Sequence, residues 1–301
     1  MLNERPIFII GFQHGGTSVL LNWLRTHPHV CSPWGETHEV FRGAGGGVMS
    51  KTFRLYKLAL YLPIVLIQRE IPFHDRNWNI RRPMPNWLGR YVDWLIFKDK
   101  FRARGETQNR YKSEGIEYTE AEIAESRTLM KSTNGDIFSV DIFNKMYSDA
   151  TFLGLVRNGF AVVEGHLRRN GTIEDVSHKY ERGAQQLLEY SERLPNFHII
   201  RFEDVLENPL QQFDHIYDLC DLDTREITKI RMITRPIITS TGHHEYVHGT
   251  SRETMVWINP EEMTGFLDPS VTENQIRRLS PEQKEKIVEI AGDSLRQLGY
   301  L

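Results

Sequence analysis

A glycine-rich segment directly after the first apolar run constrains the fold of this chain more than any other feature. The residues Pro6–Ile10 are mostly β-branched or aromatic, which predicts a buried strand. The segment Gly11–Ser18 follows, and apolar residues then recur along Ser18–Thr26 until His27 and Pro28 end the predicted helix. A strand, a glycine turn and a helix in this order favour a phosphate-binding loop, because backbone N–H groups and the helix dipole attract an anion there.

The spacing of this loop indicates which phosphate groups it can hold. It matches Gly-x-x-x-x-Gly followed by Lys and Ser or Thr, except that Thr17 stands at the lysine position. That lysine reaches the terminal phosphates of a nucleoside triphosphate, so its replacement disfavours an ATPase, a GTPase or a small-molecule kinase. A purely structural turn is the alternative to a phosphate site. If the loop does bind, the expected contacts are Gln13, His14, Gly15, Gly16, Thr17 and Ser18.

Three further apolar runs indicate the fold class. They are Thr128–Lys131, Thr151–Val156 and Phe197–Phe202, and helix-length patterns separate them. Strands that alternate with helices predict an α/β fold with a mostly parallel central sheet flanked by helices, similar to P-loop proteins. Ligands of such sheets bind at the carboxyl ends of the strands. A last packing helix is predicted after Ser280, because Pro281 suits the first helical position.

Residues 41–126 differ from the rest of the chain. They open with the run Gly43–Gly47, contain no clear strand, and mix Trp78, Trp87 and Trp94 with many arginines and lysines. We therefore predict a single domain over residues 1–301 that contains a helical insertion at 41–126. The insertion either completes the core as a cap or covers a bound acceptor as a lid.

Composition and charge exclude several classes of function. The chain has 37 Lys and Arg against 40 Asp and Glu, a net charge of −3, which gives no general reason to bind nucleic acid or a membrane surface. The apolar stretch Leu55–Ile67 contains a lysine and a proline and is too short to span a bilayer. With only two cysteines, Cys31 and Cys220, a disulfide framework is excluded and a reducing, cytoplasmic compartment is expected.

Several short segments, taken in order and spacing, resemble the superfamily of sulfotransferases that use 3′-phosphoadenylyl sulfate (PAPS). The loop with the following Leu24–Pro28 resembles their 5′-phosphosulfate loop, Ala150–Gly159 resembles a strand that delivers an arginine, and Arg201–Pro209 resembles their Arg-Tyr-Glu-Asp-Leu segment. Leu279–Glu282 and Leu298–Tyr300 resemble their C-terminus. In motif layout the chain is most similar to tyrosylprotein and carbohydrate sulfotransferases. The resemblance covers both ends and the middle of the chain but not the insertion.

The resemblance implies a set of contacts to the nucleotide. Arg157 would grip the 3′-phosphate, for which its planar fork of donors and its permanent charge are suited. Gly165 stands where the family normally has a serine. Arg169 matches a further arginine of tyrosylprotein sulfotransferases, and Arg168 is its rival.

The loop itself departs from the family at two positions. His14 replaces an arginine or lysine, and Gly15 replaces a serine. An imidazole with an ordinary pKa of about 6.5 can donate to a phosphate but is not reliably charged. We still expect His14 to contribute to transfer, and a charged His14 predicts turnover that falls as the pH rises past its pKa.

The same resemblance implies the remaining catalytic residues. Sulfuryl transfer needs a base for the acceptor proton and positive charge at the departing phosphate, and it demands no metal. Glu36 is the implied base, with His38 and Glu39 as competitors and a plain surface charge as the alternative. Lys131, at the end of a predicted strand, matches a lysine near the bridging oxygen of the cofactor.

A histidine cluster in the last quarter of the chain does not predict a metal site. His243, His244 and His248 lack the spacing of a helical His-Glu-x-x-His site, and glycines on both sides predict a loop. Because the comparable stretch of the family folds over the cofactor, Ser251 and Arg252 are further candidates for nucleotide contacts.

We therefore expect an enzyme that transfers a sulfuryl group from PAPS to an acceptor hydroxyl, with no nucleic-acid partner and no metal. Aromatic and basic residues of the insertion suit a small-molecule, carbohydrate or glycoconjugate acceptor. The alternative is a catalytically inactive scaffold of the same fold that binds a nucleotide. The sequence leaves the oligomeric state open.

Overall fold

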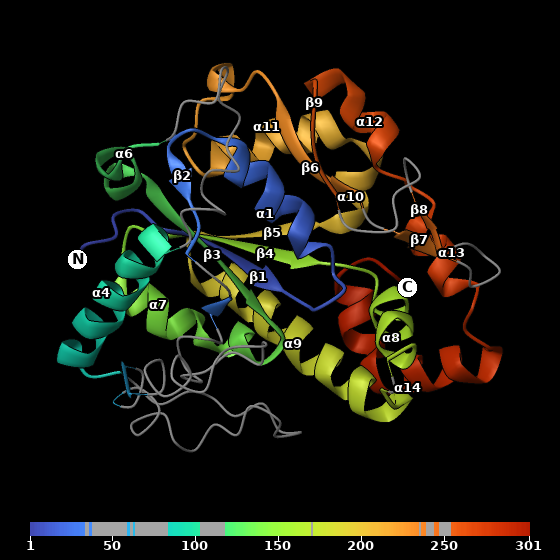
Figure 1. Cartoon of the computed structure of the whole chain (residues 1–301). Helices are drawn as coiled ribbons and strands as arrows, with labels where there is room; N and C mark the ends of the chain where they lie inside the picture. Colours follow the sequence, from blue (N-terminus) through green and yellow to red (C-terminus); the bar gives the residue numbers. More distant parts are fainter. Residues whose placement is uncertain are drawn as a thin grey trace.

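The fold is built on a five-stranded sheet. The computed structural model describes residues 1–33, 36–37, 59–60, 63, 84–102, 118–169, 171–234, 236–238, 244–246 and 254–301. The sheet has the strand order β2-β3-β1-β4-β5 and all of its neighbouring strands are parallel (Figure 1). Its members are β1 (Ile7–Gly11), β2 (Val30–Cys31), β3 (Arg127–Thr133), β4 (Thr151–Val156) and β5 (Phe197–Arg201). The predicted fold class is thus confirmed.

All four predicted strands are present, with ends that shift by one or two residues. Strand β4 has the predicted bounds, whereas β3 is longer than the predicted Thr128–Lys131 at both ends. Every residue of β1 is buried, because helices cover both faces of the sheet, and this explains why the strand reads as an unbroken apolar run. The two-residue edge strand β2 is too short for a periodicity to reveal it.

Helices pack on both faces of the sheet and form two separate hydrophobic cores (Figure 1). One face carries α1 (Thr17–Thr26), α10 (Phe202–Glu207) and α11 (Pro209–Leu219). The other face carries α4 (Asn86–Arg102), α7 (Val140–Met146), α8 (Gly159–Leu167), α9 (Ile173–Arg193) and α14 (Pro281–Gln297). Strand β1 contributes to both cores, Ile7 and Ile9 to the first and Phe8 and Ile10 to the second.

The predicted insertion at 41–126 contains helices α4 and α6 (Glu120–Glu125), and most of its other residues lie outside the described part. Helix α4 packs Leu88 and Val92 into the second core. Its buried Asp93 accepts hydrogen bonds from the Asn3 side chain at 2.8 Å and the Tyr147 hydroxyl at 2.9 Å. Helix α4 therefore forms part of the second core. That residues 41–126 act as a cap or as a lid over an acceptor stays a prediction.

The chain after α11 forms a small antiparallel region and three helices. Strand β6 (Ile230–Thr234) pairs with β9 (Thr254–Ile258), and β7 (Pro236–Ile238) pairs with β8 (His244–Tyr246). The loop predicted around the histidine cluster is therefore wrong at residues 244–246, where alternation is too short to indicate a strand. Helices α12 (Met263–Phe266), α13 (Val271–Ile276) and α14 follow.

Local sequence signals set the ends of these helices. Helix α14 begins with a capping box between Ser280 and Gln283 and has Pro281 in its first turn, as predicted. Short 3-10 helices connect other elements: η2 (Asn134–Ser139), η3 (Thr224–Glu226) and η5 (Pro260–Glu262).

No helix among the described residues has the length and apolar character needed to cross a membrane.

Candidate functional site at the carboxyl edge of the sheet

Three adjacent strands end together at one edge of the sheet. Gly11, the last residue of β1, lies beside Thr133 of β3 and Leu155 of β4. The glycine loop continues from β1, Lys131 precedes the end of β3, and Arg157 follows the end of β4. Parallel pairing therefore brings together residues that lie more than a hundred positions apart in the chain, at the edge where ligands of such sheets bind.

The glycine loop turns sharply into helix α1. The N–H of Gly15 donates to the carbonyl of Phe12 at 3.0 Å, and Gly16 caps the helix with a φ of 92°. That left-handed conformation favours glycine, and the ring of Phe202 lies so close to Gly16 that a Cβ atom would overlap it. Gly16 has no side chain to cap α1, and its carbonyl accepts from the N–H of Val19 at 2.8 Å. The positive end of the α1 dipole at this turn is suited to an anion.

His14 occupies the middle of the loop in a left-handed conformation, with a φ of 64°. Its ring lies edge-on to the ring of His166, with 4.9 Å between the centroids. Burial, and next the charges of His166, Arg169, Arg168 and Arg157, lowers the pKa of His14 to about 4. The loop thus presents a neutral imidazole at pH 7, and the idea of a charged His14 does not hold for the unliganded protein.

Gly165 faces His14 from helix α8. A Cβ atom at residue 165 would lie 3.2 Å from the Cβ of His14, which is a tight contact. Two of the three positions at which the sequence departs from the family pattern, 14 and 165, are therefore neighbours in space. His166 follows on the same helix and its Nδ1 lies 3.0 Å from the carbonyl of Val162, which orients the ring toward the loop.

Arg157 is almost entirely buried, with 5% of its surface exposed. Its Nη1 donates to the backbone carbonyl of His14 at 2.8 Å, and its Nη2 donates to Thr272 Oγ1 at 3.2 Å and to Gln275 Oε1. Its guanidinium also stacks over the ring of Phe202 at 4.8 Å. Burial lowers the pKa of Arg157 to about 10, which leaves the side chain protonated at pH 7.

Helix α8 ends in two arginines with different surroundings. Arg168 pairs with the buried Glu164 at 2.9 Å, and Arg278 pairs with the same carboxylate at 3.2 Å. Arg169 is exposed, has no ion-pair partner among the described residues, and is close enough to His14 to lower its pKa. Of the two rivals, Arg169 is the arginine whose charge remains available to a ligand.

Glu36 and Lys131 form an ion pair beside the loop. The Nζ of Lys131 lies 2.7 Å from Glu36 Oε1, and the hydroxyl of Thr133 donates to Glu36 Oε2 at 2.7 Å. Both charged side chains are partly exposed, 15% for Lys131 and 26% for Glu36. The two residues proposed for chemistry are therefore in direct contact.

The predicted contacts in the loop occupy the expected turn and the start of α1. Gln13 is exposed, Gly15 and Thr17 are buried, and Gly16 and Ser18 are half-buried. Other candidates lie outside the described residues: His38, Glu39, His243, His248, Ser251 and Arg252. Among the described residues, no group of three His, Cys, Asp or Glu side chains could hold a metal ion.

The structure adds residues that the sequence did not indicate. Thr272 and Gln275 contact Arg157, and Glu203 accepts from the N–H of Asn158 at 3.1 Å and the hydroxyl of Tyr300 at 2.7 Å. Glu203 and Tyr300 lie in two segments that carry the family resemblance, so they could have been proposed. Nothing in the sequence of α13 marks Thr272 and Gln275.

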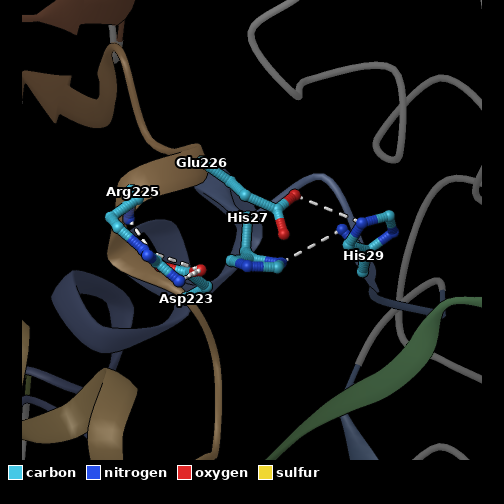
Figure 2. Close-up of polar contacts among 5 residues, drawn as sticks. All are labelled: His27, His29, Asp223, Arg225 and Glu226. Atoms are coloured by element: carbon cyan, nitrogen blue, oxygen red, sulfur yellow. Dashed lines mark hydrogen bonds and ion pairs between the residues drawn. The ribbon is translucent and has the colours of Figure 1, made fainter.

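A second histidine cluster lies at the opposite end of helix α1. His27 is buried, its Nδ1 accepts from the N–H of His29 at 3.1 Å, and His29 Nε2 lies 3.2 Å from Glu226 Oε2 (Figure 2). Next to it, Arg225 and Asp223 pair at 2.6 Å (Figure 2). Burial lowers the pKa of His27 to about 4. This cluster joins α1 to η3 and lies away from the loop.

Comparisons with known proteins agree with this fold. The model of the sulfotransferase family matches residues 6–226. The sulfotransferase domain from the curacin biosynthetic pathway has a similar structure, with 16% identity, a TM-score of 0.53, and coverage of 99% of this chain and 98% of that one. The sulfotransferase domain of the olefin synthase from Synechococcus PCC 7002 is 15% identical, with a TM-score of 0.50. That match covers 97% of this chain and 94% of the olefin synthase domain. No curated protein matches significantly.

Proposed function

The chain belongs to the sulfotransferase family, and from that premise we propose that it transfers a sulfuryl group from PAPS to an acceptor hydroxyl. One observation carries the proposal: the Glu36–Lys131 ion pair and the buried Arg157 lie at the ends of the two strands that flank the glycine loop. A base, a cation and an anion-binding loop are thus adjacent, as transfer between an acceptor and a charged nucleotide requires.

The residues of the site fit a nucleotide with phosphates at two positions. The N-terminal end of α1 and its dipole suit the 5′-phosphosulfate, with Gln13, His14, Gly15, Gly16, Thr17 and Ser18 around it. Among the described atoms, the Nε of Arg157 is a buried donor without a hydrogen bond, which fits a 3′-phosphate. Arg169 adds a second positive charge, and Gly165 leaves room for His14.

Each catalytic residue has a defined task in the proposed reaction. Glu36 accepts the proton of the acceptor hydroxyl as that oxygen forms its bond to sulfur. Lys131 stabilises the phosphate oxygen that receives the electron pair of the breaking sulfur–oxygen bond, so that 3′-phosphoadenosine 5′-phosphate departs. His14 donates a hydrogen bond as a neutral imidazole. None of these steps needs a metal.

The acceptor and the location are further parts of the proposal. The segment 41–126 combines Trp78, Trp87 and Trp94 with many arginines and lysines. Aromatic and basic groups suit a carbohydrate, a glycoconjugate or a similar small anionic molecule. A cytoplasmic enzyme is proposed because two cysteines give no disulfide framework.

Calorimetry with nucleotides tests the co-substrate. We expect 3′-phosphoadenosine 5′-phosphate to bind in the micromolar range or tighter and ATP to give no response, since no loop lysine reaches its terminal phosphates. Binding of ATP alone would overturn the assignment. Transfer of labelled sulfate from PAPS to a panel of sugars and phenols then tests the reaction. Nucleotide binding without transfer to any acceptor would support the inactive scaffold instead.

A further inference from the structure

Arg157 is a buried cation whose direct partners in the protein are uncharged. Its hydrogen bonds go to the carbonyl of His14, the hydroxyl of Thr272 and the amide oxygen of Gln275. No carboxylate among the described residues forms an ion pair with it, although the nearby charges of Glu203 and Glu164 raise its pKa and so partly offset the effect of burial. Glu203 Oε1 accepts from the hydroxyl of Thr272 at 3.4 Å. A cation without a contacting anion is costly to bury, so the surroundings of Arg157 favour an incoming anion.

The donors of Arg157 are unevenly used. Its Nε is buried and makes no hydrogen bond among the described residues, whereas both partners from α13 are on Nη2. Nε and Nη2 project from the same edge of a guanidinium, and this edge can hold a phosphate through two parallel hydrogen bonds. One half of this edge therefore has no hydrogen-bond acceptor among the described residues, and Thr272 and Gln275 of α13 supply acceptors to the other half.

We propose that Gln275 competes with the nucleotide's 3′-phosphate for Arg157, so that α13 must release Arg157 when the nucleotide binds. This inference rests on the proposed function and identifies a residue that sets the preference for a 3′-phosphate. A phosphate displaces Gln275 because its charge-assisted hydrogen bonds are stronger than those of a neutral amide oxygen. Helix α13 lies beyond the matched residues 6–226, so the competing group comes from a part of the chain that the family pattern does not define.

Two substitutions change the competition in opposite directions. Gln275→Glu replaces the neutral acceptor with a carboxylate and should hold Arg157 in an ion pair, which weakens binding of 3′-phosphoadenosine 5′-phosphate about tenfold or more. Gln275→Ala removes the competitor and should tighten that binding by roughly threefold or more. Adenosine 5′-phosphate lacks the 3′-phosphate, so its affinity should change by less than about twofold in both variants.

Calorimetry on the full chain with these two nucleotides gives the test, and Asn274→Asp is the matched control. It adds the same charge to the neighbouring residue of α13, which has no contact with Arg157, and so reports the general effect of a negative charge. The inference would be overturned if Gln275→Glu lost the same amount of affinity for both nucleotides, or if its affinity for both were unchanged. It would also be overturned if Gln275→Ala bound the 3′-phosphorylated nucleotide more weakly, because Gln275 would then contribute a contact to the phosphate.

Failure of the proposed function has a different signature: the wild-type chain would not bind 3′-phosphoadenosine 5′-phosphate.

Thr272→Val is an independent variant in case circular dichroism shows that Gln275→Glu is not folded. It removes the other α13 acceptor of Arg157 with little change of shape. It should tighten binding of the 3′-phosphorylated nucleotide in the direction of Gln275→Ala, and a loss of affinity would count against the inference.

Discussion

Gly165 and His14 lie in contact across the loop, so that a Cβ atom on Gly165 would be 3.2 Å from the Cβ of His14. Each residue departs from the family pattern, and taken singly each looks like a weakened site. Together they form one packing unit, because a larger residue at 165 would press on a larger residue at 14. The neutral ring of His14 also avoids a further positive charge beside Arg157, Arg168 and Arg169.

A double-mutant cycle tests this packing unit. In the wild type, Gly165→Ala places a methyl group against His14 and should lower the free energy of unfolding by about 1 kcal/mol. In a His14→Gly background the contact is absent, so the same change should instead stabilise helix α8 by up to about 1 kcal/mol through helix propensity. Urea denaturation measures both, and a coupling energy near zero would show that the two residues do not constrain each other.

Glu36→Gln separates binding from transfer. The amide keeps the shape of the side chain and can still accept from Thr133, but it cannot take a proton, so transfer should fall by about 10²–10⁴-fold with nucleotide affinity nearly unchanged. Labelled-sulfate transfer and calorimetry measure the two quantities. Glu192→Gln, on the exposed face of α9, is the matched control. Full transfer by Glu36→Gln would mean that the base is another residue.

The arginines after α8 should behave differently when each is replaced by alanine. Arg169→Ala removes an available charge and should weaken binding of 3′-phosphoadenosine 5′-phosphate by about tenfold. Arg168→Ala leaves Glu164 with Arg278, so it should lower the melting temperature with little effect on affinity. Calorimetry and thermal unfolding of both variants decide the assignment, and the opposite pattern would make Arg168 the phosphate ligand.

Acid should destabilise the fold through His27. Its pKa of about 4 in the folded protein lies below the value of about 6.5 in an unfolded chain, so the unfolded state binds more protons between these pH values. The free energy of unfolding should therefore fall as the pH drops from about 6.5 to about 4, with His27 contributing roughly 3 kcal/mol. Protonation would also remove the acceptor for the N–H of His29 (Figure 2).

Urea denaturation across this pH range compares three proteins. His27→Asn keeps an acceptor without a titrating ring and should remove the part of the pH dependence due to His27, leaving a comparable part due to His14. His178→Asn, on an exposed position of α9, controls for loss of any histidine. An equal slope in His27→Asn and the wild type would rule out His27 as the source.

Much of the fold could be predicted from the sequence, because buried parallel strands leave unbroken apolar runs such as Ile7–Gly11 and Thr151–Val156. Short edge elements could not, since β2 has two residues and β8 has three. The positions of glycine and proline were sufficient to predict the glycine loop and the helix after it, because both elements depend on local sequence.

The contacts of the site depend on long-range packing and were less accessible. The Glu36–Lys131 pair joins residues far apart in the chain, and only the family resemblance suggested both. The contact between Gly165 and His14 could not be predicted, because it depends on how α8 packs against the loop. The lowered pKa of His14 could not be predicted either, because it results from the burial of the ring and from nearby arginines that are distant in the sequence.

The central position of β1 divides the site along the chain as well as in space. Glu36 and Lys131 lie on the β3 side, and both come before residue 134 in the chain. Arg157 and the residues of α8 and α13 lie on the β4 side, and all of them come after residue 150. Under the proposed function, the residues that would activate the acceptor and those that would hold the nucleotide therefore occupy separate stretches of the chain. Either group could change in evolution while the other is kept.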